Sequence, residues 1–463
     1  MKKNKVLLFL YAISSFCFAF TQEELLEKLY QNNAEIIKAE SDYMQACLDV
    51  KDAKGGFGPT IDLQISGTYM VNPPIGEISV STEDLVSVLS DEGYSIPIPI
   101  PEPENDSVVL YEGMEHTLYN FQLKLTQPLF TWGKLTNAVK LYEKVADIRL
   151  LQKNDLLRKK KIELLSRETA VYFLEQIEQV LDEQSKYAAR LVEISQAYAN
   201  NGLLLKQDVL NAKMQAQEID VAKKNLQREK EIQLIEIQKL FSGEIDLSEI
   251  NYIPDEKKLK QYLSLSRSSL EEYAVNEENE QIKILNALIE TSRLAEKIAD
   301  ASVYWKPDIA LQTSIGYTGQ RFPWIQEDWN DYGKYSLNFT LGLRTTVWDG
   351  GKAIRDVKRK KDDLNNAISQ YNDSVMQLKM AAATAYSDMS LAESKYQYQK
   401  LLIENDELNL KRHESEYKAG YGTEIDVLKA KIQKLTDTIT SYQLQTEMHV
   451  NCLTLQYLGG DRI

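Results

Sequence analysis

Two aspartates, Asp208 and Asp426, are the residues of this sequence whose surroundings best suit a chemical role. Each follows a glycine-containing break and precedes a helical pattern, and the stretch around Asp426 (residues 417–433) reads YKAGYGTEIDVLKAKIQ. An acid in this place can cap the N-terminus of a helix, or it can present its charge to passing ions. The sequence allows both roles.

The two aspartates belong to an internal repeat. Seven residues around the first break recur 218 positions later with the same identity. The pairs are Gly202/Gly420, Asp208/Asp426, Val209/Val427, Leu210/Leu428, Ala212/Ala430, Lys213/Lys431 and Gln215/Gln433. Repeats of this kind indicate that one structural unit is built twice.

No other group of residues suggests catalysis. The histidines, His116, His413 and His449, have no metal-ligand spacing. No phosphate-binding loop or nucleophile elbow is present. We therefore predict neither an enzyme nor a cofactor or metal.

Composition and targeting narrow the class further. The net charge of −15, from 54 basic and 69 acidic residues, excludes a general nucleic-acid binder. Residues 1–19 have the basic and apolar regions of a secretory signal peptide, and cleavage after Ala19 is expected. No later apolar run reaches the ~18 residues of a membrane-spanning helix. Cys47 and Cys452 remain, and the sequence does not say whether they are oxidised.

Long helices are expected to carry the two breaks. Residues 133–199 lack internal glycine and proline, and as one helix they would extend for about 100 Å. A second helix over about 208–241 completes a hairpin. In the other repeat an apolar heptad seam covers 354–396 and resumes over 425–442, which indicates coiled-coil packing.

Four shorter segments alternate apolar and polar residues with the period of a β-strand, at 61–71, 119–126, 309–317 and 335–343. Pro128 is expected to limit the second of them. The strands are long enough to cross a bilayer, and a helix over 21–54 precedes the first. The insert at 72–117, with a proline run at 96–101, is interpreted as an exposed acidic loop.

Four strands cannot close a barrel in lipid, and an open sheet edge is not tolerated there. The protein must then oligomerise, and a trimer with twelve strands leaves room for a pore. The main alternative is a secreted structural or adhesive coiled-coil protein without a channel. That alternative explains the heptads but not the strands.

The predicted organisation has a signal peptide, two structural repeats and a connector. The boundaries are 1–19 for the signal peptide, 20–241 for the first repeat (loop 72–117, helical hairpin 133–241), 242–267 for an equatorial connector, 268–458 for the second repeat (loop 318–334, helical hairpin 351–458) and 459–463 for a C-terminal tail.

This order resembles the TolC-like outer membrane factor (outer membrane efflux protein) family. The resemblance is carried by LTQPLFTWGKL (125–135), LRTTVWDGGKA (343–353), YANNGLLLKQDVLNA (198–212) and YKAGYGTEIDVLKA (417–430). It implies an α+β membrane protein: a trimeric twelve-stranded outer-membrane β-barrel, continuous with a periplasmic coiled-coil tunnel. The implied function is the exit duct of a tripartite efflux or type I secretion system. The implied partners are a periplasmic adaptor and an inner-membrane pump of the RND, ABC or MFS class.

The resemblance also assigns site residues. Asp426 matches the first acid that rings the closed tunnel end, and Asp208 matches its counterpart in the first repeat. Lys429 stands where the family has a second acid, so it could pair with Asp426 rather than repel it. The turn residues match the adaptor-docking tips of the family: Gly202, Leu203, Gly420, Tyr421, Gly422 and Thr423.

Overall fold

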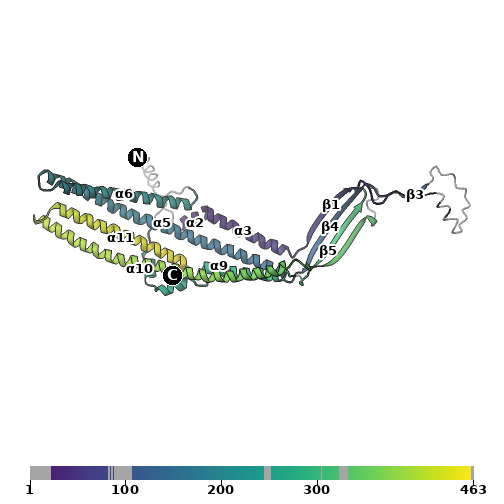
Figure 1. Ribbon diagram of the computed structural model, residues 1–463. Helices are drawn as coiled ribbons and strands as arrows, with labels where there is room; N and C mark the ends of the chain where they lie inside the picture. The colour runs from purple at the N-terminus through teal and green to yellow at the C-terminus, as the bar shows by residue number, and fades with distance from the viewer. Residues whose placement is uncertain are drawn as a thin grey trace, which may run out of the picture. The chain divides into compact units, whose positions relative to one another are not determined.

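The computed structural model describes residues 22–81, 107–243, 252–303, 305–322 and 332–459, together with positions 84 and 87. The predicted signal peptide, the proline run and most of the C-terminal tail lie outside these residues. The chain divides into two compact units (Figure 1). One unit comprises Met1–Asp49, Leu141–Arg293 and Lys361–Ile463, and the other comprises Val50–Lys140 and Leu294–Lys360.

Two helical hairpins dominate the first unit. The first consists of α5 (Lys134–Asn200) and α6 (Lys206–Leu240), and the second of α10 (Lys352–Lys418) and α11 (Glu424–Gly459). Both long helices have 67 residues, and their partners have 35 and 36. The offset of 218 between the repeats therefore corresponds to hairpins of equal length.

Shorter helices precede each hairpin in the chain. They are α2 (Gln22–Asn32) and α3 (Ala34–Gly55) before the first, and α7 (Glu256–Leu263), α8 (Arg267–Ala274) and α9 (Glu280–Asp300) before the second. The single helix predicted over 21–54 is therefore wrong, because the chain breaks at Asn33. The chain breaks in the same way at Asn279, between α8 and α9.

Two buried asparagines explain these breaks. The Asn33 amide donates to the Leu240 carbonyl at 2.7 Å, and its side-chain oxygen caps α3. The Asn279 amide donates to the Leu458 carbonyl at 2.8 Å, and its oxygen accepts from the Gln281 backbone. Leu240 and Leu458 are 218 positions apart, so each asparagine ties a helix start to the end of its own repeat's hairpin.

We expect Asn279→Ala to lower the free energy of unfolding by about 2–4 kcal/mol, because two buried carbonyls, of Ala274 and Leu458, lose their donor. Asn276→Ala is the matched control, since the Asn276 side chain accepts a local hydrogen bond from the Glu278 backbone N–H. Thermal unfolding of the detergent-purified protein measures both. Equal melting temperatures for the two variants would contradict this role of Asn279.

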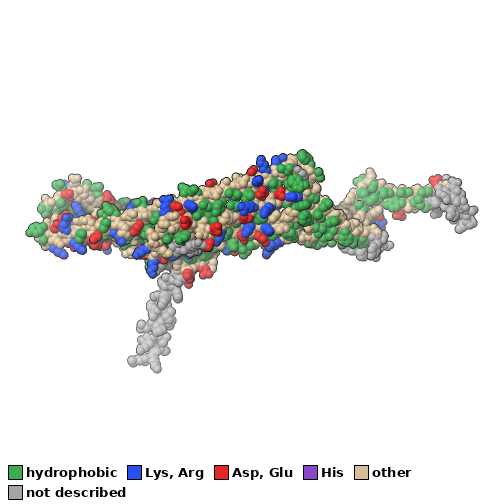
Figure 2. All heavy atoms as spheres, turned by 90° about the horizontal axis from the view of Figure 1, so that it is seen from below, with side chains coloured by type: hydrophobic (Ala, Val, Ile, Leu, Met, Phe, Trp, Pro, Cys, Tyr) green, Lys and Arg blue, Asp and Glu red, His purple; other side chains and the backbone are tan. Residues whose placement is uncertain are grey.

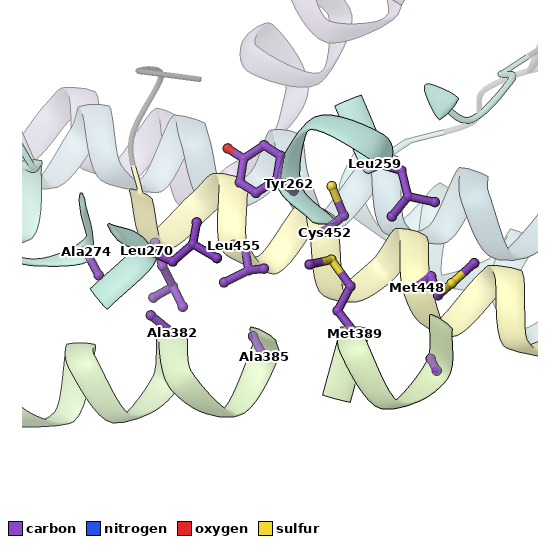
Figure 3. Close-up of a cluster of buried hydrophobic side chains, with 12 residues drawn as sticks. Leu259, Tyr262, Leu270, Ala274, Ala382, Ala385, Met389, Met448, Cys452 and Leu455 are labelled. Atoms are coloured by element: carbon purple, nitrogen blue, oxygen red, sulfur yellow. The ribbon is translucent and has the colours of Figure 1, made fainter. Parts of the chain in front are cut away.

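Three apolar clusters form the core of the helical unit. The largest joins α7 and α8 to α10 and α11 around Met389, which is fully buried (Figure 3). In that view Tyr262 and Leu270 approach from α7 and α8, and Met448 and the free thiol of Cys452 approach from α11. A second cluster packs α5 and α6 against the start of α11, and a third packs α2 against α5 and α6. Residues of both repeats therefore share a core.

The second unit contains a four-stranded antiparallel sheet in the order β1-β4-β5-β6. Its strands are β1 (Thr60–Tyr69), β4 (Thr117–Phe130), β5 (Asp308–Gly319) and β6 (Tyr335–Arg344). The four predicted strands are all present. Among the residues that the structure describes, β1 and β6 are the edge strands, each paired on one side only.

The register places the apolar residues of all four strands on one face. Leu63, Leu123, Ile315 and Leu337 form one row across the sheet. Asp62, Lys124, Ser314 and Asn338 form the neighbouring row on the other face. Most of the apolar face is uncovered, and eight of its side chains are each more than half exposed: Ile61, Leu63, Ile65, Ile315, Leu337, Phe339, Leu341 and Leu343. Figure 2 shows charged side chains mainly over the helical part of the chain.

Two predictions about the strands need correction. Pro128 lies inside β4 rather than ending it, because β1 pairs with β4 only as far as Thr126 and the β5 side has a bulge at Pro128/Phe130. The insert at 72–117 is also not entirely a loop. It contains a two-stranded ribbon of β2 (Ile78–Ser81) and β3 (Ser107–Tyr111).

The passage from strand to long helix is built alike in both repeats. Trp132 and Gly133 have φ values of 53° and 81°, and Gly350 and Gly351 have 68° and 79°. A non-glycine residue is strained in this region. The indole nitrogen of Trp132 donates to the Pro307 carbonyl at 2.9 Å and holds it in place.

Candidate channel entrance

The tips of the two hairpins have the same backbone geometry. The Gly202 N–H donates to the Ala199 carbonyl at 3.0 Å, and the next N–H reaches back five residues to the Tyr198 carbonyl. Gly420 donates in the same way to the Tyr417 carbonyl at 3.0 Å. Both are Schellman motifs, which need a left-handed residue, and the φ values of Gly202 and Gly420 are 73° and 81°. The recurrence of glycine at an offset of 218 thus has a conformational cause.

Both predicted aspartates cap the helix that follows the turn. The Asp426 carboxylate accepts from the Thr423 N–H at 3.2 Å and from the Thr423 hydroxyl at 2.6 Å. The Thr423 oxygen accepts in return from the Asp426 N–H, which completes a capping box. Asp208 accepts from the Leu205 N–H at 3.1 Å, but leucine offers no side-chain acceptor in return. Capping is therefore one role of each aspartate.

A cleft of about 470 Å³ lies beside the second tip. It brings Asp426 and Lys429 together with residues of α6 and α10, whereas Asp208 and the turn residues are not in its lining. The lining residues are Gln215, Asp406, Asn409, Arg412, His413, Asp426, Lys429, Ala430 and Gln433. Carboxylates, cations and a histidine face one space, so the charge of this cleft depends on pH.

The turn residues themselves are largely exposed. Tyr421 is 91% exposed and Leu203 is 70% exposed, and Leu205, which the sequence did not single out, is 69% exposed. Large apolar side chains in such positions are available for contact with another protein. Leu205 could have been recognised from its place between the Gly202 turn and the Asp208 cap.

The cleft residues of α10 were also missed. The apolar seam of this helix passes through Ala385 and Ala392, and the same heptad position then continues as Gln399, Asp406 and His413. The sequence therefore contains a signal for these cleft residues, which is the point where the apolar seam of α10 becomes polar. Burial, followed by the carboxyl of Asp437, raises the pKa of Asp406 to about 6.

Within the described residues, no three His, Cys, Asp or Glu side chains are grouped closely enough to hold a metal ion. None of the described helices is both long enough and apolar enough to span a bilayer.

The geometry of hairpins, sheet and tips can be compared with known proteins. The family model described as "Outer membrane efflux protein" matches residues 276–460, which cover α9 to α11 with β5, β6 and the second tip. Residues 276–460 are an outer membrane efflux protein domain. For these residues, which include the motifs at 343–353 and 417–430, the family predicted from the sequence is confirmed. No curated protein has a significantly similar sequence.

Solved structures of similar fold match nearly the whole chain. VceC of Vibrio cholerae matches with a TM-score of 0.71 and 17% identity, over 95% of this chain and 96% of that one. CmeC of Campylobacter jejuni matches with a TM-score of 0.71 and 12% identity, over 95% of this chain and 85% of that one. MtrE of Neisseria gonorrhoeae matches with a TM-score of 0.66 and 13% identity, over 95% of this chain and 89% of that one.

At these identities the structures establish the fold, which combines long helical hairpins with a β-domain. Together with the match to the efflux protein family over residues 276–460, they support an efflux-type outer membrane channel.

Proposed function

We propose that this protein is the outer-membrane exit duct of a tripartite efflux or type I secretion system. The observation that carries the proposal is the sheet with one exposed apolar face and two unpaired edges, joined in one chain to two hairpins of equal length. Its place is the outer membrane, with the helical tunnel in the periplasm. The chain is organised as repeats over 20–241 and 268–458 about a connector at 242–267.

The channel is a homotrimer. Three copies of the four-stranded sheet give twelve strands, with β6 of one protomer pairing with β1 of the next, so that no edge is left in lipid. The helices support the same assembly, because α10 has a second apolar stripe that is more than half exposed in one chain. Its members are Met376, Met380, Leu391, Tyr398, Leu401 and Leu408.

The tips are the inner end of the duct. Gly202, Leu203, Gly420, Tyr421, Gly422 and Thr423 dock a periplasmic adaptor, which connects the duct to an inner-membrane pump of the RND, ABC or MFS class. Exposed Tyr421 and Leu203 are the anchors. Asp426, Lys429 and Asp208 surround the constriction of the closed duct.

Removal of the charge at the constriction is expected to change ion passage. Asp426→Ala loses the capping box, at a cost of about 1 kcal/mol, and also removes a carboxylate from the mouth. Single-channel conductance and block by divalent cations, measured in planar bilayers, should therefore both change. Thr423→Val is the matched control, because it weakens the same cap but keeps the charge. If Asp426→Ala and the native channel conduct and are blocked equally, the constriction role is wrong.

The proposed function is tested by fractionation and by loss of the gene product. We expect the chain in the outer-membrane fraction, as a heat-modifiable species that chemical cross-linking converts to a trimer. A deletion strain should lose resistance to particular compounds or lose a secreted protein, and a pull-down should recover an adaptor and a pump. A monomer in the soluble fraction, with no export defect, would favour the coiled-coil alternative.

A further inference from the structure

The side chains that α10 packs against α11 change from apolar to polar toward the tip of the second hairpin. Ala385 and Ala392 of α10 are buried in the apolar core, but Gln399 and Asp406 continue the same position at intervals of seven residues. Residues seven apart lie two turns from each other on one helix face. Asp406 therefore points to α11, as Gln399 does.

The residue of α11 that meets this face is another acid, Asp437. The Gln399 amide donates to the Asp437 carboxylate at 2.7 Å and to its backbone carbonyl at 3.1 Å. The Gln433 amide donates to the other carboxylate oxygen at 2.8 Å. Both oxygens of Asp437 thus have a hydrogen-bond donor.

Asp406 has a different environment. Its Oδ2 is buried and has no hydrogen-bond partner, and its carboxyl lies within hydrogen-bonding reach of the Asp437 carboxyl. A proton on Asp406 would give both carboxyl groups a hydrogen-bond partner, because protonated Asp406 would donate to the Asp437 carboxylate. Without that proton, two carboxylates face each other across the seam.

Other charges near the pair do not replace this proton. Lys434 of α11 acts on the charge of Asp406, but its ammonium group is 2.8 Å from Glu407 of α10 and is engaged there. His413 is 3.1 Å from Glu416. The remaining charged groups of the cleft are Arg412 on α10 and Asp426 and Lys429 on α11, while α6 contributes the uncharged Gln215.

We propose that Asp406 and Asp437 form a proton-operated latch between α10 and α11. One shared proton closes the latch, and the loss of that proton loosens it. The sign follows from the raised pKa of Asp406, about 6 against 3.8 for a free side chain. The stabilisation of the contact between α10 and α11 is complete below pH 3.8 and is lost as the pH rises through about 6. Asp406 lines the same cleft as Asp426. Acid therefore makes the tip of the second hairpin more rigid than neutral pH does.

Hydrogen exchange of the full-length protein in detergent tests the latch. After correction for intrinsic exchange rates, amides of residues 399–413 and 430–440 should be about tenfold less protected at pH 7.5 than at pH 5.0. Asp406→Asn, whose amide donates to Asp437 at every pH, should keep the acid-like protection at both pH values. Asp437→Asn should behave in the same way, because it removes the repulsion from the other side.

Two further variants serve as controls. Asp388→Asn changes an exposed carboxylate on α10 away from the pair, and His413→Gln removes the neighbouring histidine. Both should keep the pH dependence of the native protein. The latch is contradicted if native protection is equal at the two pH values, if Asp406→Asn still responds, or if His413→Gln abolishes the response. The experiment needs no transport, so its result is independent of the proposed channel function.

Discussion

Phe339→Lys is expected to abolish assembly of the protein in the outer membrane. Phe339 lies in the middle of β6 on the apolar face and is 69% exposed. A lysine facing lipid near the bilayer midplane costs about 2–4 kcal/mol, and a trimer would contain three. The measurement is the amount of heat-modifiable trimer in the outer-membrane fraction.

Asn338→Lys is the matched control for this prediction. Asn338 precedes Phe339 on the same strand but faces the opposite side of the sheet, in the row that contains Asp62 and Lys124. A lysine there would face the interior of the barrel, where charges are tolerated. Equal assembly of the two variants would show that the apolar face does not contact lipid.

Arg158→Met is expected to destabilise the helical unit by about 3–5 kcal/mol. Arg158 of α5 forms an ion pair with Glu280 at the start of α9, and it donates to the Tyr457 carbonyl of α11 at 2.7 Å. Both charged side chains are mostly buried, so methionine would leave Glu280 without its partner. The fall in melting temperature of the detergent-purified protein measures the effect.

The double variant Arg158→Met/Glu280→Gln separates two explanations. If the cost arises from an uncompensated carboxylate, the second change should recover part of the lost stability. If the double variant is no more stable than Arg158→Met, the loss would instead come from the packing of the arginine on the Tyr457 ring, whose centroid is 5.8 Å away.

Much of the fold was accessible from the sequence because it depends on local periodicity. Alternation identified the four strands, and the absence of glycine and proline identified α5. The constant offset of 218 predicted hairpins of matching length. These signals are strong because one pattern persists over many residues.

The features that were missed depend on single residues and on distant partners. Asn33 and Asn279 break helices because carbonyls more than 170 positions away accept their amides. Pro128 is tolerated in β4 because the neighbouring strand β1 ends its pairing at Thr126. No window of sequence around these residues contains that information.

The candidate site was predictable in part for the same reason. The capping role of Asp426 follows from Thr423 three residues before it, which is a local pattern. The cleft was not predictable, since Asp406 joins it through the packing of α10 on α11. Its first sign in the sequence is the change from Ala392 to Gln399 at one heptad position.

The central claim is that three copies of this chain form one channel. The most direct measurement is the conductance of purified, cross-linked trimer added to a planar lipid bilayer. We expect stepwise openings of uniform size from the native trimer. We expect none from an equal amount of purified Phe339→Lys protein, which should fail to assemble and to insert. A native trimer that never conducts, or conductance that is unchanged in Phe339→Lys, would contradict the account.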